Sequence, residues 1–148
     1  MLINGEWRAA SADATTFSAT NPATGEQLAE TYPLASAADI DALLDAGTAA
    51  AQALRSATTS QIAAFLTGYA DAIDTAADDL AAIAATETGL PVAPRLTGVE
   101  IPRTTGQLRQ AAAAAQSDEW TNPVVDAANN LRSRLESLGK PVLTIGPN

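Results

Sequence analysis

The chain has 148 residues, of which 47% are hydrophobic and 4% aromatic, with 8 basic and 17 acidic side chains. The net charge of −9 argues against nucleic acid or an anionic membrane surface as a partner, because both repel an acidic protein. Neither cysteine nor histidine occurs, which excludes disulfides, thiolate chemistry and the commonest metal ligand within these residues. Alanine dominates the apolar content and buries little surface, so we expect a thin core.

The sequence has neither the pattern of a signal peptide nor that of a membrane-spanning segment. The N-terminal stretch MLINGEWRAAS has neither a basic region nor a long apolar region, and both are needed in a signal peptide. No segment approaches the run of about eighteen apolar residues that spans a bilayer. We therefore expect a cytoplasmic protein.

Short β hairpins are predicted at the start of the chain. Asn4 and Gly5 lie between two short runs with apolar residues, and both positions of a type I′ turn need the positive φ that these residues tolerate. A second pair of strands is predicted at Thr15–Ala19 and Gln27–Tyr32, separated by turn residues at Asn21–Gly25.

Helical patterns follow. Ser36 with Asp39 predicts a capped helix start, and a second helix is predicted to be capped by one of the hydroxyl residues at positions 58–60. Asp78 and Asp79 could cap a separate following helix, so the second helix could be one long rod or two pieces, and Gly89 is expected to end it. Its apolar side chains recur about every 3.6 residues, and we expect this stripe to be buried: Ile62, Phe65, Leu66, Tyr69, Ile73, Ala76, Leu80 and Ile83.

A third helical region is predicted over Val92–Gln116, with a break or kink near Ile101 because Pro102 removes a backbone hydrogen bond. Arg103 and Arg109 are separated by hydroxyls, a glycine and an amide. These groups could line a polar pocket for an acid, or they could form the solvated side of an ordinary helix.

The C-terminal part is predicted to contain a loop at Ser117–Asn130 and a half-exposed edge strand at Leu131–Leu138. Val142–Ile145 has the pattern of a strand buried on both faces, and the turn at Gly146 and Pro147 follows it. Open α/β sheets usually bind ligands at such a strand end.

Taken together and in order, these segments resemble the N-terminal part of the aldehyde dehydrogenase superfamily: LINGEWR, TNPATGEQLAE, ASAADIDALLDA, TETGLP, PRTTGQLR and LGKPVLTIGPN. The pairing of Glu87–Pro91 with Arg103–Arg109 is most similar to the α-ketoglutaric semialdehyde (2,5-dioxovalerate) dehydrogenases. The resemblance implies the α/β fold of that family. This chain would be an incomplete, mostly α-helical piece of it, with short N-terminal β hairpins and a C-terminal β segment.

The resemblance also suggests how the chain is divided. Leu131–Leu138 resembles the oligomerisation arm of the family, and Val142–Ile145 resembles the first strand of its cofactor domain. Four parts are expected: N-terminal β hairpins (1–35), a helical region (36–116), a loop and arm-like edge strand (117–138) and the start of a truncated cofactor-binding domain (139–148).

The chemistry of the family sets expectations for the site. A cysteine thiolate attacks the aldehyde, hydride passes to NAD or NADP, and a glutamate activates water, but this chain lacks that cysteine and the glutamate region. An ungapped count places Asn148 at the asparagine that stabilises the oxyanion, whereas an insertion at Lys140 would place that asparagine one residue further on. Cofactor contacts are implied for Ile145, Gly146 and Pro147, although we expect no stable cofactor binding by this chain alone.

Two hypotheses for function follow. The first is an N-terminal fragment, inactive alone, of an NAD(P)-dependent dehydrogenase that oxidises a short carboxylated semialdehyde similar to 2,5-dioxopentanoate. Arg103 and Arg109 are then candidate anchors for the substrate carboxylate, and a homo-oligomer or pairing with a full-length relative is expected. The alternative is an autonomous acidic helical module that binds a partner through its exposed C-terminal strand. The pattern of Val142–Ile145 favours the first hypothesis, because it fits a sheet that these residues alone do not build.

Overall fold

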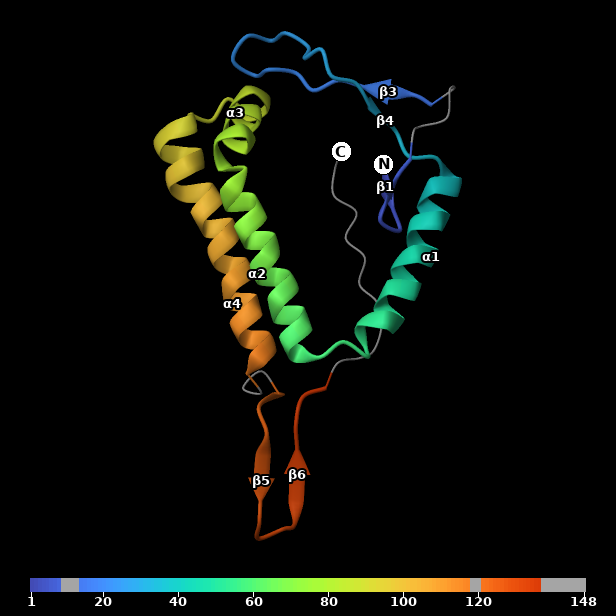
Figure 1. The fold of residues 1–148 in the computed structure, drawn as a ribbon, viewed down its shortest axis with the longest axis vertical. Coiled ribbons are helices and arrows are strands. Elements are labelled where there is room, and N and C mark those ends of the chain that lie inside the picture. The colour runs from blue at the N-terminus through green and yellow to red at the C-terminus, as the bar shows by residue number, and fades with distance from the viewer. Residues whose placement is uncertain (9–13, 118–120, 137–148) are drawn as a thin grey trace. The chain divides into compact units, whose positions relative to one another are not determined.

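The computed structural model describes residues 1–8, 14–117 and 121–136. The chain divides into two compact units, one that runs from the N-terminus to Ser56 and one that begins at Ala57. Within the described residues the protein is mostly helical, with three small antiparallel strand pairs (Figure 1). The unit boundary falls between the first two helices, inside the predicted helical region 36–116.

The first unit opens with the predicted hairpin. Leu2 pairs with Trp7 and Ile3 pairs with Glu6 in antiparallel register. The turn residues Asn4 and Gly5 have φ values of 54° and 78°, which confirms the turn expected from their tolerance of positive φ. The elements of this unit are β1 (Leu2–Ile3), β2 (Glu6–Trp7), β3 (Thr16–Phe17), β4 (Tyr32–Pro33) and α1 (Ala37–Leu54).

The second strand pair is shorter than predicted. β3 and β4 pair through only two residues each, and Pro33 lies opposite Thr16 inside β4. Gln27, the expected start of the second strand, forms an isolated bridge with Thr20. A two-stranded pair leaves each strand at an edge, where a proline without a backbone N–H is tolerated. The Phe17 and Tyr32 rings lie 5.6 Å apart across the pair.

The predicted start of α1 is confirmed by a capping box. The Asp39 backbone N–H donates to Ser36 Oγ at 3.2 Å, and the Ser36 backbone N–H donates to Asp39 Oδ2 at 2.9 Å. Hydrogen bonds from the Ser36 hydroxyl and amide hold the pKa of Asp39 below its ordinary value. These bonds satisfy backbone donors that the first helical turn leaves without a partner.

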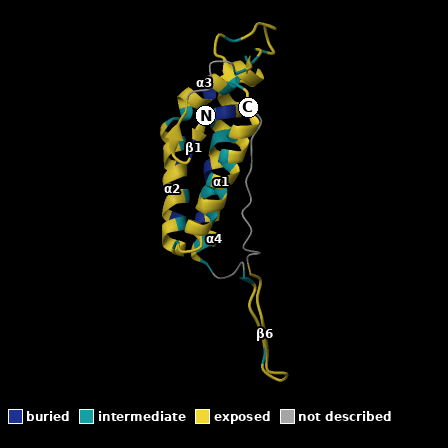
Figure 2. Ribbon diagram, turned by 90° about the vertical axis from the view of Figure 1, so that its right-hand side faces the viewer, coloured by how far each residue is buried: buried dark blue, intermediate teal, exposed yellow. Residues whose placement is uncertain are grey.

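The second unit is built on two helices that run side by side, α2 and α4 (Figure 1). Buried side chains are few, and most are small, as the composition predicts; exposed surface predominates in Figure 2. Short side chains allow close approach of the two backbones but bury little apolar area. The elements of this unit are α2 (Thr59–Thr75), α3 (Ala77–Thr88), the π-helical segment η1 (Val92–Glu100), α4 (Ile101–Gln116), β5 (Val124–Asp126) and β6 (Leu131–Ser133).

The predicted second helix consists of two pieces. The break falls at Ala76, whose φ and ψ of −95° and 12° are not those of an α-helix. α2 begins at Thr58 with a second capping box, formed with Gln61. Gly89 ends α3 with a φ of 71°, which confirms the predicted helix stop.

The predicted burial of the apolar stripe is wrong for its largest side chains. Phe65 is 70% exposed and Ile83 is 58% exposed. α2 buries Ala63 and Ala70 instead, at 3% and 0% exposure. The face of α2 that meets its neighbours is therefore defined by small residues seven positions apart, about two helical turns. A hydropathy pattern gives alanine less weight than phenylalanine or isoleucine.

The break or kink predicted near Ile101 is not found, because Ile101 keeps helical φ and ψ of −65° and −51° and only the hydrogen-bond pattern changes there. The Ile101 N–H donates to the Leu96 carbonyl in the π-helical pattern of η1, and α4 begins at Ile101. Pro102 thus lies in the first turn of α4, where a missing backbone donor costs little. Within η1, Ala93 has an extended backbone with a φ of −121°.

The predicted loop at Ser117–Asn130 contains a strand that sequence reasoning missed. β5 pairs with β6, and Val125 lies opposite Arg132. The Asn129 N–H donates to Asp126 Oδ1 at 3.1 Å in the connecting turn. The residues of this Asx-type turn were the sequence signal from which the hairpin could have been predicted. The edge strand predicted at Leu131–Leu138 is confined to Leu131–Ser133 within the described residues.

None of the helices within the described ranges is long and apolar enough to cross a membrane. The predicted buried strand at Val142–Ile145 lies outside the described residues.

Candidate functional site

The first candidate cluster surrounds Glu100, at the end of η1. Arg103 Nη2 lies 2.7 Å from Glu100 Oε2, and Arg95 Nη2 contacts the other carboxylate oxygen, Oε1. The Glu100 side chain is only 22% exposed, whereas Arg95 and Arg103 are 49% and 63% exposed. Two guanidinium groups therefore share one partly buried carboxylate, and the cluster has a formal charge of +1.

The second cluster surrounds Arg109 and joins α4 to α2. Arg109 Nη2 donates to Asp71 Oδ1 at 2.7 Å and to Asp74 Oδ2 at 2.8 Å. The hydrogen bond from Arg109 holds the pKa of Asp74 below its ordinary value, with a smaller contribution from Thr105. The two carboxylates raise the pKa of Arg109 in return. One guanidinium here faces two carboxylates, so this cluster has a formal charge of −1.

The structure does not bring the two predicted arginines into one pocket. Arg103 and Arg109 both lie on α4, but each belongs to its own ion-pair cluster. Six positions on an α-helix correspond to a rotation of about 240° between two side chains, so different faces of α4 carry them. Of the hydroxyls between them, Thr104 donates to the Glu100 carbonyl at 2.9 Å, and Thr105 is 3% exposed.

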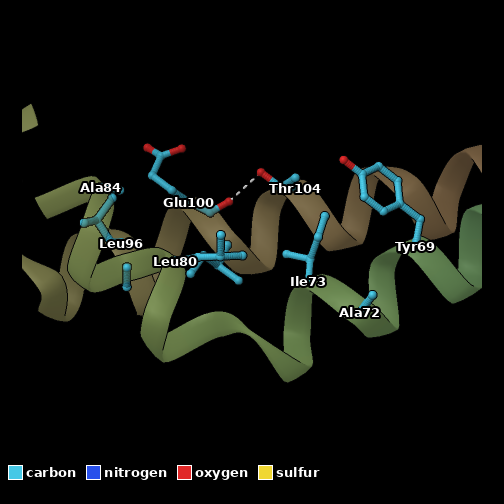
Figure 3. Close-up of a pocket in the computed structure, with 10 residues that line it drawn as sticks. Tyr69, Ala72, Ile73, Leu80, Ala84, Leu96, Glu100 and Thr104 are labelled. Carbon is cyan, nitrogen blue, oxygen red and sulfur yellow. Dashed lines mark hydrogen bonds between the residues drawn. The ribbon is translucent and has the colours of Figure 1, made fainter. Parts of the chain in front are cut away.

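An apolar groove lies beside the Glu100 cluster, between α2, α3, η1 and α4. Its volume is about 580 Å³. Figure 3 shows the Ile73 and Leu80 side chains in the groove and the Glu100 carboxylate directed away from them. Most of the lining is aliphatic: Tyr69, Ala72, Ile73, Leu80, Ala81, Ala84, Leu96, Glu100, Ile101 and Thr104.

Several residues of these clusters were not singled out from the sequence. Glu100 and Arg103 have the i, i+3 spacing of a helical ion pair, which was a usable signal. Asp71 and Asp74 have the same spacing on α2, but only the packing of α2 against α4 shows that Arg109 lies between them.

The remaining predicted site residues lie outside the described residues: Ile145, Gly146, Pro147 and Asn148. Within the parts of the chain that the structure describes, no group of three or more His, Cys, Asp or Glu side chains is arranged to hold a metal ion.

Comparison with known proteins shows the family to which this chain belongs. The model of the aldehyde dehydrogenase family matches residues 7–147, and the chain belongs to this family. It is 36% identical to "Alpha-ketoglutaric semialdehyde dehydrogenase 2" of Azospirillum brasilense over 155 residues, which cover 99% of this chain and 29% of that protein. Both findings confirm the resemblance seen in the sequence motifs. The chain therefore spans less than a third of the length of this relative.

Proposed function

We propose that this chain is the N-terminal part of an NAD(P)-dependent aldehyde dehydrogenase that oxidises a short carboxylated semialdehyde to the acid. The main support is the 36% identity, over nearly the whole chain, to a relative named as an α-ketoglutaric semialdehyde dehydrogenase. The family match over residues 7–147 supports the same class of reaction. The chain contains no cysteine, so the proposal includes no turnover by these residues alone.

In this proposal the described residues hold the acid end of the substrate. A carboxylate is attracted to a site with excess positive charge and repelled by one with excess negative charge. The charges around Arg103 favour it as the anchor, because Arg95 and Arg103 share the single carboxylate of Glu100. The charges around Arg109 disfavour it, because Asp71 and Asp74 both face its guanidinium.

The nicotinamide cofactor of the family would accept hydride from the substrate. The residues that the family resemblance implies for cofactor and oxyanion, Ile145–Asn148, lie outside the described residues. The part proposed for the described chain is therefore limited to substrate binding and to scaffolding.

The exposed hairpin is the proposed association surface. Val125 and Leu131 are 67% and 62% exposed on β5 and β6. An isolated two-stranded hairpin is marginally stable in water, and further strands or packing would stabilise it. We therefore include pairing with another copy, or with a full-length relative, in the proposal.

The experiment compares three proteins for formation of reduced nicotinamide from 2,5-dioxopentanoate. They are this chain, the Azospirillum brasilense relative, and a fusion in which this chain replaces the matching segment of that relative. We expect no turnover by this chain and clear turnover by the fusion. Turnover by the chain alone would contradict the inactivity, and a folded fusion inactive with every aldehyde would contradict the proposed role.

The substrate anchor is tested in the same fusion. Arg103→Gln is expected to raise KM for the carboxylated aldehyde about tenfold, since a charge-assisted hydrogen bond contributes about 1.5–3 kcal/mol. KM for an uncharged aldehyde of similar length should stay unchanged. Arg134→Gln serves as the matched control, because it removes the same charge from a residue that pairs with Glu136, two positions away. An equal effect of Arg103→Gln and Arg134→Gln, or no effect of Arg103→Gln, would make the assignment of the anchor wrong.

A further inference from the structure

The ion pair between Arg95 and Glu100 spans five positions of the chain, a spacing that an α-helix does not support. At 3.6 residues per turn, side chains five positions apart lie about 140° from each other around the helix axis. Ion pairs in α-helices join residues three or four positions apart. The pair between Glu100 and Arg103 has this ordinary spacing. Glu100 therefore lies where one helical winding changes into another.

The π-helical winding of η1 brings Arg95 to Glu100. The Ile101 N–H donates to the carbonyl of Leu96, five positions earlier, so residues five apart, rather than four, lie above one another in this turn. In α winding the Ile101 N–H would bind the carbonyl of Thr97 instead, and Leu96, which is 6% exposed, would leave its buried position. Burial of Leu96 and the pairing of Arg95 with Glu100 thus favour the same winding.

The second partner of Glu100 changes the charge that Arg103 presents. Glu100 and Arg103 alone would form a neutral pair, whereas Arg95 gives the three groups a formal charge of +1. The side chain of Glu100 is 22% exposed, so water and salt screen these pairs less than they screen fully exposed ones. A guanidinium has five N–H donors, so Arg103 keeps donors for a second anion while it pairs with Glu100. Single π turns are also frequent at functional sites.

We propose that Arg95 is a positioning residue that acts on Arg103 through Glu100 and strengthens the preference for a carboxylated substrate. Arg95 holds the Glu100 carboxylate across the π turn and takes up part of its charge. Arg103 is held in the first turn of α4 by the same carboxylate and keeps an excess of positive charge for the substrate. Because Arg103 binds the substrate carboxylate in the proposed function, this role of Arg95 rests on that proposal. It adds a second arginine and the helical winding that places it.

The kinetic test uses the fusion with the Azospirillum brasilense relative. Arg95→Gln should raise KM for 2,5-dioxopentanoate about threefold, the effect expected of one charge near a surface, and leave kcat unchanged. KM for an uncharged aldehyde of similar length should not change. Arg95→Lys keeps the charge at the same position and should keep KM within about twofold of the unmodified fusion. Arg134→Gln, which removes the same charge from a residue that pairs with Glu136, should leave both KM values unchanged.

A displaced arginine separates the effect of the π winding from that of charge alone. Arg95→Gln with Thr97→Arg restores the charge of η1 but places it three positions from Glu100, a spacing that suits an α-helix and not the five positions of the π turn. This double variant should keep the raised KM of Arg95→Gln. In the whole chain, ¹⁵N NMR measures the contact independently of activity. Arg95→Gln should shift the side-chain Nε–H signal of Arg103, and Thr97→Arg should not restore it.

Three results would overturn the role of Arg95 while leaving the proposed function intact. The first is a raised KM in Arg103→Gln with an unchanged KM in Arg95→Gln. The second is full recovery of KM by the displaced arginine at position 97, and the third is an unchanged Nε–H signal of Arg103 in Arg95→Gln. An unchanged KM in Arg103→Gln would instead contradict the proposed substrate anchor, and the role of Arg95 would fail with it.

Discussion

Arg109 on α4 donates to Asp74 on α2 at 2.8 Å, across 35 positions of the chain. Together with the bond from Arg109 to Asp71, this contact joins two helices whose buried interface consists largely of alanine and threonine. Small side chains permit several sliding arrangements of two helices. The bonds from one guanidinium to two carboxylates, which repeat at i and i+3, favour a single register.

Replacement of Arg109 by glutamine should lower the Tm of the chain and remove part of its dependence on salt. The two aspartates would lose their shared cation and repel each other across one helical turn. Arg134→Gln is the matched control, because Arg134 pairs only two residues away, with Glu136. Thermal unfolding at low and high salt measures both variants, and an equal Tm for Arg109→Gln and the unmodified protein would contradict the register role.

The stability of the chain should fall in acid, partly through Asp74. Its pKa in the folded chain lies below the ordinary value of 3.8 because of the bond from Arg109. The folded state therefore binds fewer protons than the unfolded state. This contribution is fully present above pH 3.8 and is lost as the pH falls through the lowered pKa. Asp74→Asn should show a shallower decline of Tm below pH 3.8 than the unmodified chain, whereas an unchanged slope would contradict the linkage.

Thr58 and Thr59 provide a matched pair at the start of α2. The Thr58 hydroxyl accepts a hydrogen bond from the Gln61 backbone N–H at 3.2 Å, whereas Thr59 is the first helical residue. Thr58→Ala should destabilise the fold by about 1 kcal/mol through loss of the cap. Thr59→Ala should be neutral or slightly stabilising because alanine is the better helix former. Urea unfolding measures both, and equal effects would show that the cap does not stabilise the helix.

Leu96 should matter more to stability than the larger Phe65. Leu96 is 6% exposed and Phe65 is 70% exposed. Leu96→Ala should cost about 2–5 kcal/mol, as expected for a buried aliphatic side chain. Phe65→Ala should cost less than about 1 kcal/mol, since little of the ring leaves water on folding. The reverse order in chemical unfolding would mean that Phe65 is buried in solution.

Two glycines should respond in opposite directions to alanine. Gly89 has a φ of 71° at the end of α3, where a Cβ atom costs about 1–2 kcal/mol. Gly68 lies inside α2, and a Cβ atom built there would meet nothing within 4 Å. Gly68→Ala should therefore stabilise the chain by about 0.5–1 kcal/mol. Thermal unfolding of both variants measures the difference, and destabilisation by Gly68→Ala would mean that this face of α2 has a neighbour in solution.

The sequence by itself determined the local structure and the family. Asn4 and Gly5 encode their turn through tolerance of positive φ, Ser36 and Asp39 encode their cap through short-range hydrogen bonds, and Gly89 encodes its helix end. Each of these features depends on interactions within a few residues, so each can be predicted from the sequence without the tertiary structure. The order of the sequence motifs indicated the aldehyde dehydrogenase family, and the family match over residues 7–147 confirms it.

Only the tertiary structure decided which helix faces meet and how the charges pair. The hydropathy pattern favoured Phe65 for burial, but the helix interface uses Ala63 and Ala70, because the closest packing depends on side-chain size rather than on hydropathy alone. Arg103 and Arg109 look equivalent in the sequence, yet one shares a single carboxylate with a second arginine and the other faces two carboxylates. Such pairings join residues from different elements, and the energy that selects them depends on distances that exist only once the helices have packed.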